Sequence, residues 1–168
     1  MINIVLYEPE IPQNTGNIMR TCSVFEMDLH LIEPLGFSLD EKHIKRSGMD
    51  YIGECNYKVY KNWEEFKNGK QGQFVFFSRY GMRSFEECVF EKDKDIYLVF
   101  GKESTGIDKK ILKENINDCY RIPMRKDARS LNLSNCAAIG AYECLRQIGF
   151  GDLSDRETIK GEDFLLRC

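Results

Sequence analysis

Short apolar segments alternate with helical patterns along most of the chain. The apolar segments are only a few residues long and rich in Val, Ile, Tyr and Phe, which favours buried β-strands over helices. The five expected strands are Ile2–Tyr7, Leu29–Glu33, Phe74–Ser78, Ile96–Phe100 and Tyr120–Ile122. A weaker candidate, Tyr57–Tyr60, is either an edge strand or a loop.

Helical patterns fall between these strands. Ile18–Met27 carries apolar residues at helical spacing, and Asn62 is followed three positions later by a carboxylate, as in a capping box. Ile107–Glu114 and Ser134–Ile148 also have helical character, and Gly149 is placed to end the second of them. This alternation of strands and helices predicts an α/β fold, a mostly parallel sheet flanked by helices.

The length of 168 residues fits a single domain, 1–168, that can fold without disulfides or a structural metal. The seven cysteines are dispersed and form no C-x-x-C pair, so reduced thiols in a cytosolic protein are expected. The two histidines, His30 and His43, make no metal-spaced pair, and no metal site is expected. His30 lies in an apolar run and is expected to be a core or cleft histidine.

The chain shows no sign of targeting or membrane insertion. Its first residues lack a basic segment and a long apolar run, so they indicate a strand and not a signal peptide. No stretch approaches the roughly 20 apolar residues that span a bilayer, so a soluble, cytoplasmic protein is expected. After Gly151 the tail is polar up to Phe164-Leu165-Leu166, and we expect either a docked helix or a frayed end.

The net charge of −3 argues against a nonspecific binder of polyanions, but basic side chains gather in two places. One group consists of Arg121, Arg125, Lys126 and Arg129. The other consists of Lys42, His43, Lys45 and Arg46. Each group is either a solvated face or a local surface for a polyanion.

The first of three polar elements is the run Asn14-Thr15-Gly16-Asn17, which follows the first strand and a loop stiffened by prolines. This order places the start of a helix beyond the carboxyl end of a strand, where free N–H groups suit phosphate or carboxylate. Arg20 lies one turn inside that helix and can reach back toward a ligand. The alternative is a capped helix with a surface arginine.

The second polar element, Phe100-Gly101-Lys102-Glu103-Ser104-Thr105-Gly106, follows the fourth expected strand. A P-loop needs glycine five positions before its Gly-Lys pair, where this chain has Ile96, and no G-x-G-x-x-G occurs. Both nucleotide fingerprints are therefore excluded. What remains is a glycine loop with one carboxylate, where backbone can approach a ligand closely, or an ordinary strand-to-helix turn.

The third polar element follows a strand that ends at Pro123 and leads into the long helix. Its small hydrogen-bonding side chains exceed the one residue needed to cap a helix. They alternate with Leu131 and Leu133 and are Ser130, Asn132, Ser134 and Asn135. This pattern is typical of a site that recognises a polar ligand.

In this order and at these separations, the three elements resemble the motifs of the SPOUT superfamily of RNA methyltransferases. The specific likeness is to the TrmL (YibK-like) group of tRNA 2′-O-methyltransferases. The matching segments are Pro9–Ile18, Ile32–Phe37, Phe100–Gly106, Ile122–Met124 and Arg129–Asn135, and the likeness runs from about Ile2 to Ile148. One departure is the turn Ser78-Arg79-Tyr80-Gly81, where relatives carry a Thr-Thr-Lys-Gly-like turn.

The resemblance implies a SPOUT fold with a C-terminal trefoil knot, a homodimer, and S-adenosylmethionine as methyl donor. The donor pocket would be lined by Phe77, Gly101, Ile122, Ser130, Leu131 and Asn135. Arg20 would stabilise the developing alkoxide of the substrate, because an arginine is a poor base. The other residues implied in catalysis are Asn17, Glu103, Asn132 and Tyr142, of which Tyr142 is otherwise a core or interface aromatic.

The implied substrate is the wobble nucleotide, cytidine or uridine 34, of leucine tRNAs. Since the chain has no separate RNA-binding domain, the dimer surface would hold the anticodon stem-loop. Its expected RNA contacts are Arg121, Arg125, Lys126 and Arg129. The alternatives are a SPOUT 2′-O-methyltransferase for another tRNA or rRNA position, a non-catalytic RNA-binding relative and, after the failed P-loop match, a nucleotide hydrolase.

Overall fold

The computed structural model describes residues 1–39 and 53–168, which form a seven-stranded sheet in the order β3-β2-β1-β6-β4-β7-β5. Every pairing between these strands is parallel, as the alternating pattern predicted. The strands are β1 (Ile2–Tyr7), β2 (Asp28–Ile32), β3 (Tyr57–Tyr60), β4 (Gln73–Phe77), β5 (Arg83–Ser84), β6 (Ile96–Gly101) and β7 (Cys119–Arg121).

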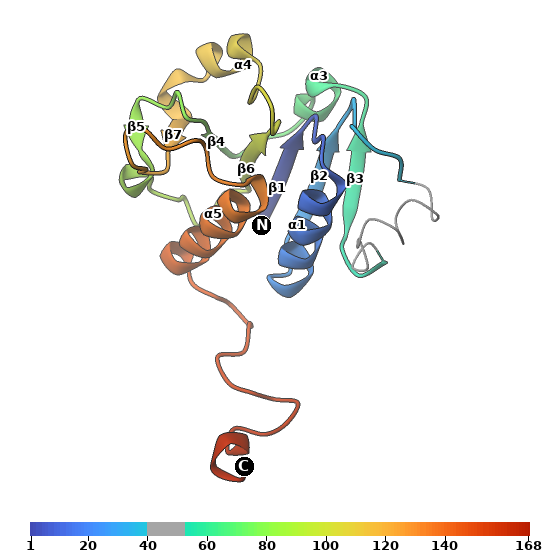
Figure 1. Cartoon of the computed structure of the whole chain (residues 1–168), viewed down its shortest axis with the longest axis vertical. Helices are drawn as coiled ribbons and strands as arrows, with labels where there is room; N and C mark the ends of the chain where they lie inside the picture. Colours follow the sequence, from blue (N-terminus) through green and yellow to red (C-terminus); the bar gives the residue numbers. More distant parts are fainter. Residues whose placement is uncertain (40–52) are drawn as a thin grey trace.

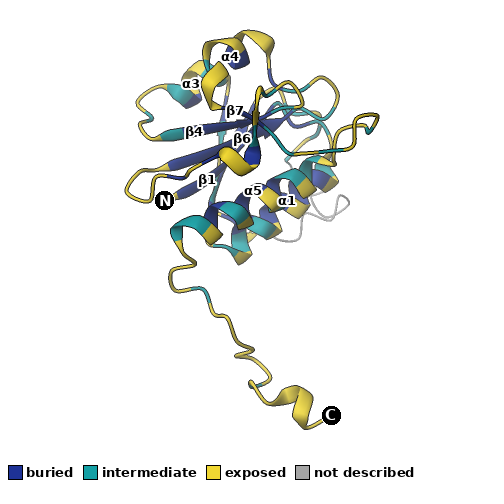
Figure 2. Cartoon of the chain, turned by 90° about the vertical axis from the view of Figure 1, so that its left-hand side faces the viewer, coloured by how far each residue is buried: buried dark blue, intermediate teal, exposed yellow. Residues whose placement is uncertain are grey.

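Helices cover both faces of the sheet (Figure 1). The long helices α1 (Pro12–Val24) and α5 (Leu133–Ile148) lie on one face, and α3 (Trp63–Lys67) and α4 (Lys109–Glu114) lie on the other (Figure 2). Short 3₁₀ helices occur at Phe85–Glu87, Ile116–Asp118 and Phe164–Leu166. The expected α/β architecture is therefore confirmed.

Each face of the sheet has its own hydrophobic core. Along β1, Ile4 and Leu6 pack toward α1 and α5, whereas Val5 and Tyr7 pack toward α3 and α4. Successive side chains of a strand point to opposite faces, so a strand covered on both sides is apolar throughout. This explains why the central strands appear in the sequence as unbroken apolar runs.

The main departure from the expected elements is the start of α1. The helix begins at Pro12, six residues before the expected Ile18, and Pro12 suits the first helical position because its missing N–H is not needed there. Asn14, Thr15 and Gly16 are consequently buried within the helix and do not form a loop before it. Arg20 lies more than two turns inside α1, so the expectation of one turn was wrong.

The other elements agree with expectation to within one or two residues at each end. β3 is the edge strand of its side of the sheet, which decides between the two alternatives left open for it. Asn62 accepts a hydrogen bond from the Glu65 N–H (2.8 Å) and caps α3, and α5 ends at Gly149. The two-residue strand β5 was not predicted, because it is too short to show a pattern.

β7 is the last strand along the chain. In the sheet it lies between β4 and β5, which are consecutive in the chain. The connection from β4 to β5 therefore crosses β7. The Ser78 N–H donates to the Tyr120 carbonyl (3.0 Å), and a Cβ on Gly81 would lie 2.5 Å from the Tyr120 carbonyl carbon. In a trefoil knot one segment of the chain passes through a loop, and a strand crossed by the β4–β5 connection is compatible with that. The knot itself stays a prediction.

Beyond α5 the tail runs away from the domain and ends in the 3₁₀ helix Phe164–Leu166 (Figures 1 and 2). Leu165 and Leu166 are 84% and 89% exposed, which favours the frayed end over the docked helix, the two alternatives expected for the tail. No helix in the described part of the chain is long and apolar enough to cross a membrane.

A buried polar group lies beneath α3. The ring of His30 in β2 is 5% exposed, and its two nitrogens lie 3.0 Å from the Tyr60 hydroxyl and 3.0 Å from Oδ1 of Asn3. Asn3 donates its side-chain N–H groups to the carbonyls of Met1 and Ile96, which leaves Oδ1 to accept from the ring. Burial lowers the pKa of His30 to about 4, so the ring is neutral in the folded protein at neutral pH.

His30 should make the fold sensitive to mild acid. Its pKa is lower in the folded than in the unfolded chain, so its contribution is present above about pH 6.5 and is lost as pH falls toward 4. The full loss is at most about 3 kcal/mol. Urea titrations give the free energy of unfolding of the wild type and of His30→Gln at about pH 7 and about pH 4.5. Between these two pH values this free energy should fall less in the variant than in the wild type. Equal losses in both proteins would contradict it.

Candidate active site

The carboxyl ends of β1, β4, β6 and β7 meet at one edge of the sheet, where their loops enclose a cavity of about 1260 Å³. Loops that follow parallel strands gather at the same edge, which is the usual ligand site of such sheets. The cavity brings together eight of the residues predicted from sequence. They are Phe77, Gly101, Glu103, Ile122, Arg129, Ser130, Leu131 and Asn132.

The remaining predicted residues do not line this cavity. Asn17 and Arg20 on α1, and Asn135 and Tyr142 on α5, lie on exposed faces of the two helices. Arg121, Arg125 and Lys126 lie near β7 and the loop after it, but they do not line the cavity either. The second basic group, at positions 42–46, lies outside the described residues.

Glu103, in the loop after β6, holds the start of α1. Its carboxylate accepts hydrogen bonds from the N–H groups of Glu10 (2.9 Å) and Ile11 (3.2 Å) and from the side-chain amide of Asn14 (3.1 Å). Ile11 occupies the N-cap position of α1 and has no side chain that can accept a hydrogen bond. The N–H groups of residues 10 and 11 are therefore not free for a ligand, because a carboxylate of the chain itself, that of Glu103, occupies them.

This contact continues into a polar network, here called the Glu103 network, that consists of Glu103, Asn14, Asn132 and Ser134. Oδ1 of Asn14 accepts from the side-chain amide of Asn132 (3.0 Å). Oδ1 of Asn132 accepts in turn from the N–H (2.8 Å) and the hydroxyl (2.6 Å) of Ser134 and caps α5. The network thus ties together the loop after β6 and the starts of α1 and α5, the three polar elements of the sequence.

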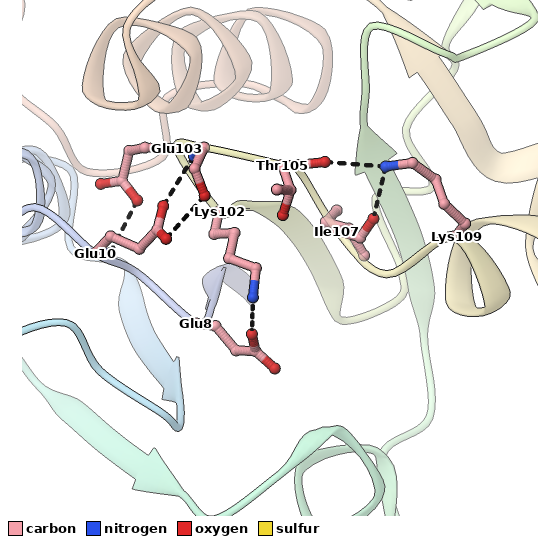
Figure 3. Close-up of polar contacts among 8 residues, drawn as sticks. Glu8, Glu10, Lys102, Glu103, Thr105, Ile107 and Lys109 are labelled. Carbon is pink, nitrogen blue, oxygen red and sulfur yellow. Dashed lines mark hydrogen bonds and ion pairs between the residues drawn. The ribbon is translucent and has the colours of Figure 1, made fainter.

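Two further contacts clamp the loop after β1 to the loop after β6 (Figure 3). Glu8 forms an ion pair with Lys102, and its hydrogen bond raises the pKa of that lysine. Glu10 accepts from the N–H and the hydroxyl of Ser104, both at 2.8 Å. Sequence reasoning missed Glu8 and Glu10 as parts of the site. It placed Asn14 in the first polar element but did not foresee its contact with Glu103.

Gly101 forms part of the cavity wall at the end of β6, next to β1. Its φ is +116°, a conformation that residues with a side chain rarely adopt, and a Cβ there would lie 2.3 Å from the Tyr7 carbonyl oxygen. Glycine is therefore needed for β6 to lie this close to the backbone of β1. Beside it the rings of Phe77 and Phe100 stack with centroids 4.4 Å apart.

The cavity therefore combines an apolar wall with backbone polar groups. Phe77, Phe100, Ile122 and Leu131 supply apolar surface, and Gly101 contributes backbone to the lining. Such a site suits a flat ring system with hydrogen-bonding edges, such as a purine. Among the described residues, no group of three His, Cys, Asp or Glu side chains is placed to hold a metal ion.

Comparison with known proteins gives concordant matches. Residues 1–142 match the SpoU rRNA Methylase family. A protein of Listeria monocytogenes, provisionally named tRNA (cytidine(34)-2′-O)-methyltransferase, is 48% identical over 153 residues, 90% of either chain. A Saccharophagus degradans protein that carries this name without qualification is 44% identical over 153 residues, 89% of this chain and 97% of its own.

Solved structures agree with these sequence matches. A Bacillus anthracis protein described as a candidate RNA methyltransferase superimposes with a TM-score of 0.87 at 45% identity, covering 94% of this chain and all of its own. A structure solved for the 2′-OH methylation of C/U34 on tRNA superimposes with a TM-score of 0.78 at 37% identity, covering 88% and 96%.

Proposed function

The chain belongs to the SpoU rRNA methylase family, and we propose that it methylates the ribose 2′-oxygen of nucleotide 34, a cytidine or uridine, in tRNA. One observation carries the proposal. Relatives named for this reaction share 44–48% of residues over about nine-tenths of the chain, and the family match over residues 1–142 spans the whole Glu103 network. Under this proposal the enzyme works in the cytoplasm, where tRNA is modified.

The proposed methyl donor is S-adenosylmethionine, which supplies a methyl group already activated by a sulfonium. The cavity fits it, because Phe77, Ile122 and Leu131 give an apolar wall and Gly101 brings backbone to the lining. Ser130 and Asn132 lie at the polar side. Asn135 does not line the cavity, so its predicted donor contact is the least supported of the set.

For the transfer itself, the chain must align the reactants and make the 2′-hydroxyl a better nucleophile. Alignment alone can contribute on the order of 7–11 kcal/mol, and the Glu103 network, by fixing the three loops, would supply it. We propose that Arg20 stabilises the alkoxide as its proton leaves, since a guanidinium stays charged and donates hydrogen bonds. Asn17, one turn before Arg20 on the exposed face of α1, would orient it.

Since Arg20 and Asn17 lie outside the cavity of their own chain, we propose that the enzyme is a homodimer built on α1 and α5. The two helices contact each other on one face of the sheet, and both leave apolar side chains uncovered. Tyr142 is 54% exposed, and its ring lies 5.7 Å from that of Phe150. Val24 and Ile139 are also exposed. Pairing of this face would cover them and place Arg20 at the boundary between the chains.

A charge placed on this face should break the dimer. In sedimentation equilibrium the wild type should be a dimer, and Tyr142→Asp should weaken association about 30-fold or more, as expected for loss of an aromatic hot spot of about 2 kcal/mol. Ile116→Asp is the matched control, because Ile116 is also an exposed apolar residue but lies by α4, on the opposite face of the sheet. A monomeric wild type, or an equal effect of both variants, would contradict the proposed interface.

The RNA would lie across the mouth of the cavity, and the basic residues around it differ in their availability. Arg129 lines the cavity, whereas Arg121 donates to the Arg79 carbonyl (2.7 Å) and Arg125 pairs with Asp127 (2.8 Å). Arg125 and Lys126 are exposed and can meet phosphates. We extend the proposal to the anticodon stem-loop of leucine tRNAs. The alternative is another position in tRNA or a position in rRNA, the RNA that the family's description names.

Two assays test the proposed function. Calorimetric titration with S-adenosylhomocysteine should show about one site per chain with micromolar affinity. Incubation with radiolabelled S-adenosylmethionine should then label tRNA in preference to rRNA from a strain that lacks the enzyme. Labelling of rRNA alone would replace the tRNA proposal with the rRNA alternative. Binding of RNA without donor binding or transfer would indicate a non-catalytic relative.

A further inference from the structure

The connection between β4 and β5, residues 78–82, is a tight turn fixed to the sheet. Ser78 accepts from the N–H of Tyr80 at its hydroxyl (3.1 Å) and from the N–H of Gly81 at its carbonyl (3.1 Å). Two contacts to β7 hold the turn down, the Ser78 N–H to the Tyr120 carbonyl (3.0 Å) and Arg121 to the Arg79 carbonyl (2.7 Å). A turn braced in this way presents its central side chains in a defined position.

Tyr80, at the centre of this turn, presents an exposed aromatic ring at the cavity. It lines the cavity and is 58% exposed. The Lys109 ammonium lies 4.6 Å from the ring centroid, and the Arg79 guanidinium carbon lies 5.7 Å from it. Lys109 is held by the carbonyls of Thr105 (3.0 Å) and Ile107 (3.4 Å), which Figure 3 shows. An accessible aromatic ring flanked by cations is a common way of binding single-stranded nucleotides.

The charge around Tyr80 favours a nucleotide of the RNA over the adenine of the methyl donor. S-adenosylmethionine carries a sulfonium, an ammonium and one carboxylate, a net charge of about +1, so nearby cations favour it less than an RNA nucleotide, which brings a negative phosphate. The two carboxylates that line the cavity among the described residues have other partners. Asp108 accepts from the Lys110 N–H (2.6 Å) to cap α4, and Glu103 holds the start of α1.

We infer that Tyr80 is a stacking platform for a base of the RNA substrate, with Lys109 and Arg79 beside it to bind the phosphate. The inference rests on the proposed RNA substrate and adds a recognition residue to it. The ring stands in the turn where this chain departs from the Thr-Thr-Lys-Gly-like sequence of the relatives it resembles. The aromatic ring provides a planar surface on which a base can stack, and Lys109, which lies beside the ring, provides a positive charge. Tyr80 thus positions the RNA and takes no part in proton transfer.

The test compares Tyr80→Ala with Tyr80→Phe, which keeps a ring for stacking. The dissociation constant of a synthetic anticodon stem-loop is measured by fluorescence anisotropy, and that of S-adenosylhomocysteine by calorimetry. Loss of one stacked base should weaken RNA binding by Tyr80→Ala about fivefold to 150-fold. Tyr80→Phe should stay near the wild type. The affinity for S-adenosylhomocysteine should be unchanged in both variants.

A second readout follows stacking directly. In Tyr80→Trp the indole fluorescence should be quenched when the stem-loop is added, and the wild type, whose single tryptophan is Trp63 on α3, gives the background. Unchanged RNA affinity in Tyr80→Ala, or a loss of S-adenosylhomocysteine affinity in place of RNA affinity, would overturn the inference. A wild type that binds the stem-loop but transfers no methyl group would overturn only the proposed function, and the Tyr80 comparison would still decide the platform.

Discussion

Replacing Arg20 with alanine is expected to lower the rate of methyl transfer roughly 100- to 1000-fold, the usual effect of removing one donor that stabilises a developing oxyanion. Arg20 is exposed on α1, so the variant should fold normally and bind S-adenosylhomocysteine as the wild type does. Single-turnover kinetics with saturating tRNA separates this effect on the chemical step from an effect on binding.

Two further variants control this result. Arg20→Lys keeps the charge but loses the planar fork of donors, so its rate should lie between those of the wild type and Arg20→Ala. Arg156→Ala removes an exposed arginine from the tail, where it pairs with Glu162, and its rate should equal that of the wild type. An unchanged rate in Arg20→Ala would remove Arg20 from the mechanism and leave alkoxide stabilisation to another cation.

Glu103→Gln should have an effect of similar size for a different reason. The carboxylate accepts three hydrogen bonds, two of them from backbone N–H groups, and an amide would turn one of its acceptor atoms into a donor. Each partner left unsatisfied costs about 1–3 kcal/mol, so kcat/KM should fall roughly 10- to 1000-fold. Because the Glu103 network holds Asn14 and Asn132, donor affinity and transfer rate should fall together.

The matched control for Glu103→Gln is Ser104→Ala, in the same loop. This change removes only the hydroxyl that donates to Glu10, and the Ser104 N–H keeps its own bond to that carboxylate. Its effect on kcat/KM should be less than about fivefold. Thermal unfolding of both variants tests whether activity falls in a folded protein. Full activity in Glu103→Gln would show that the network does not position the site.

Much of the fold could be predicted because each central strand is buried on both faces and appears as an uninterrupted apolar run. The start of α1 could not, since the carboxylate that supports it comes from Glu103, some 90 positions away in the sequence. Local propensity placed the helix start after Asn17, and the tertiary contact moved it forward to Pro12. The strand β5 exists only because residues 83–84 lie beside β7.

In the candidate site, too, the residues with a local sequence signal could be predicted and those that depend on distant contacts could not. The glycine loop at Gly101 and the polar run before α5 carry local signals, so they were recognised and the structure brings them together. Glu8 and Glu10 were missed because their partners, Lys102 and Ser104, are 94 residues away. Tyr80 was noticed only as a departure from a motif. Its role depends on Lys109, the first residue of α4 and 29 positions further along the chain.

The most direct test of the proposed function is to map the methyl group that the enzyme adds. Purified tRNA from a strain that lacks the enzyme is incubated with the protein and S-adenosylmethionine, digested with a ribonuclease and examined by mass spectrometry. The proposal predicts one added methyl group per molecule, on the ribose of nucleotide 34, with leucine tRNAs as the main substrates. A methyl group on a base, on another nucleotide or only on rRNA would contradict it.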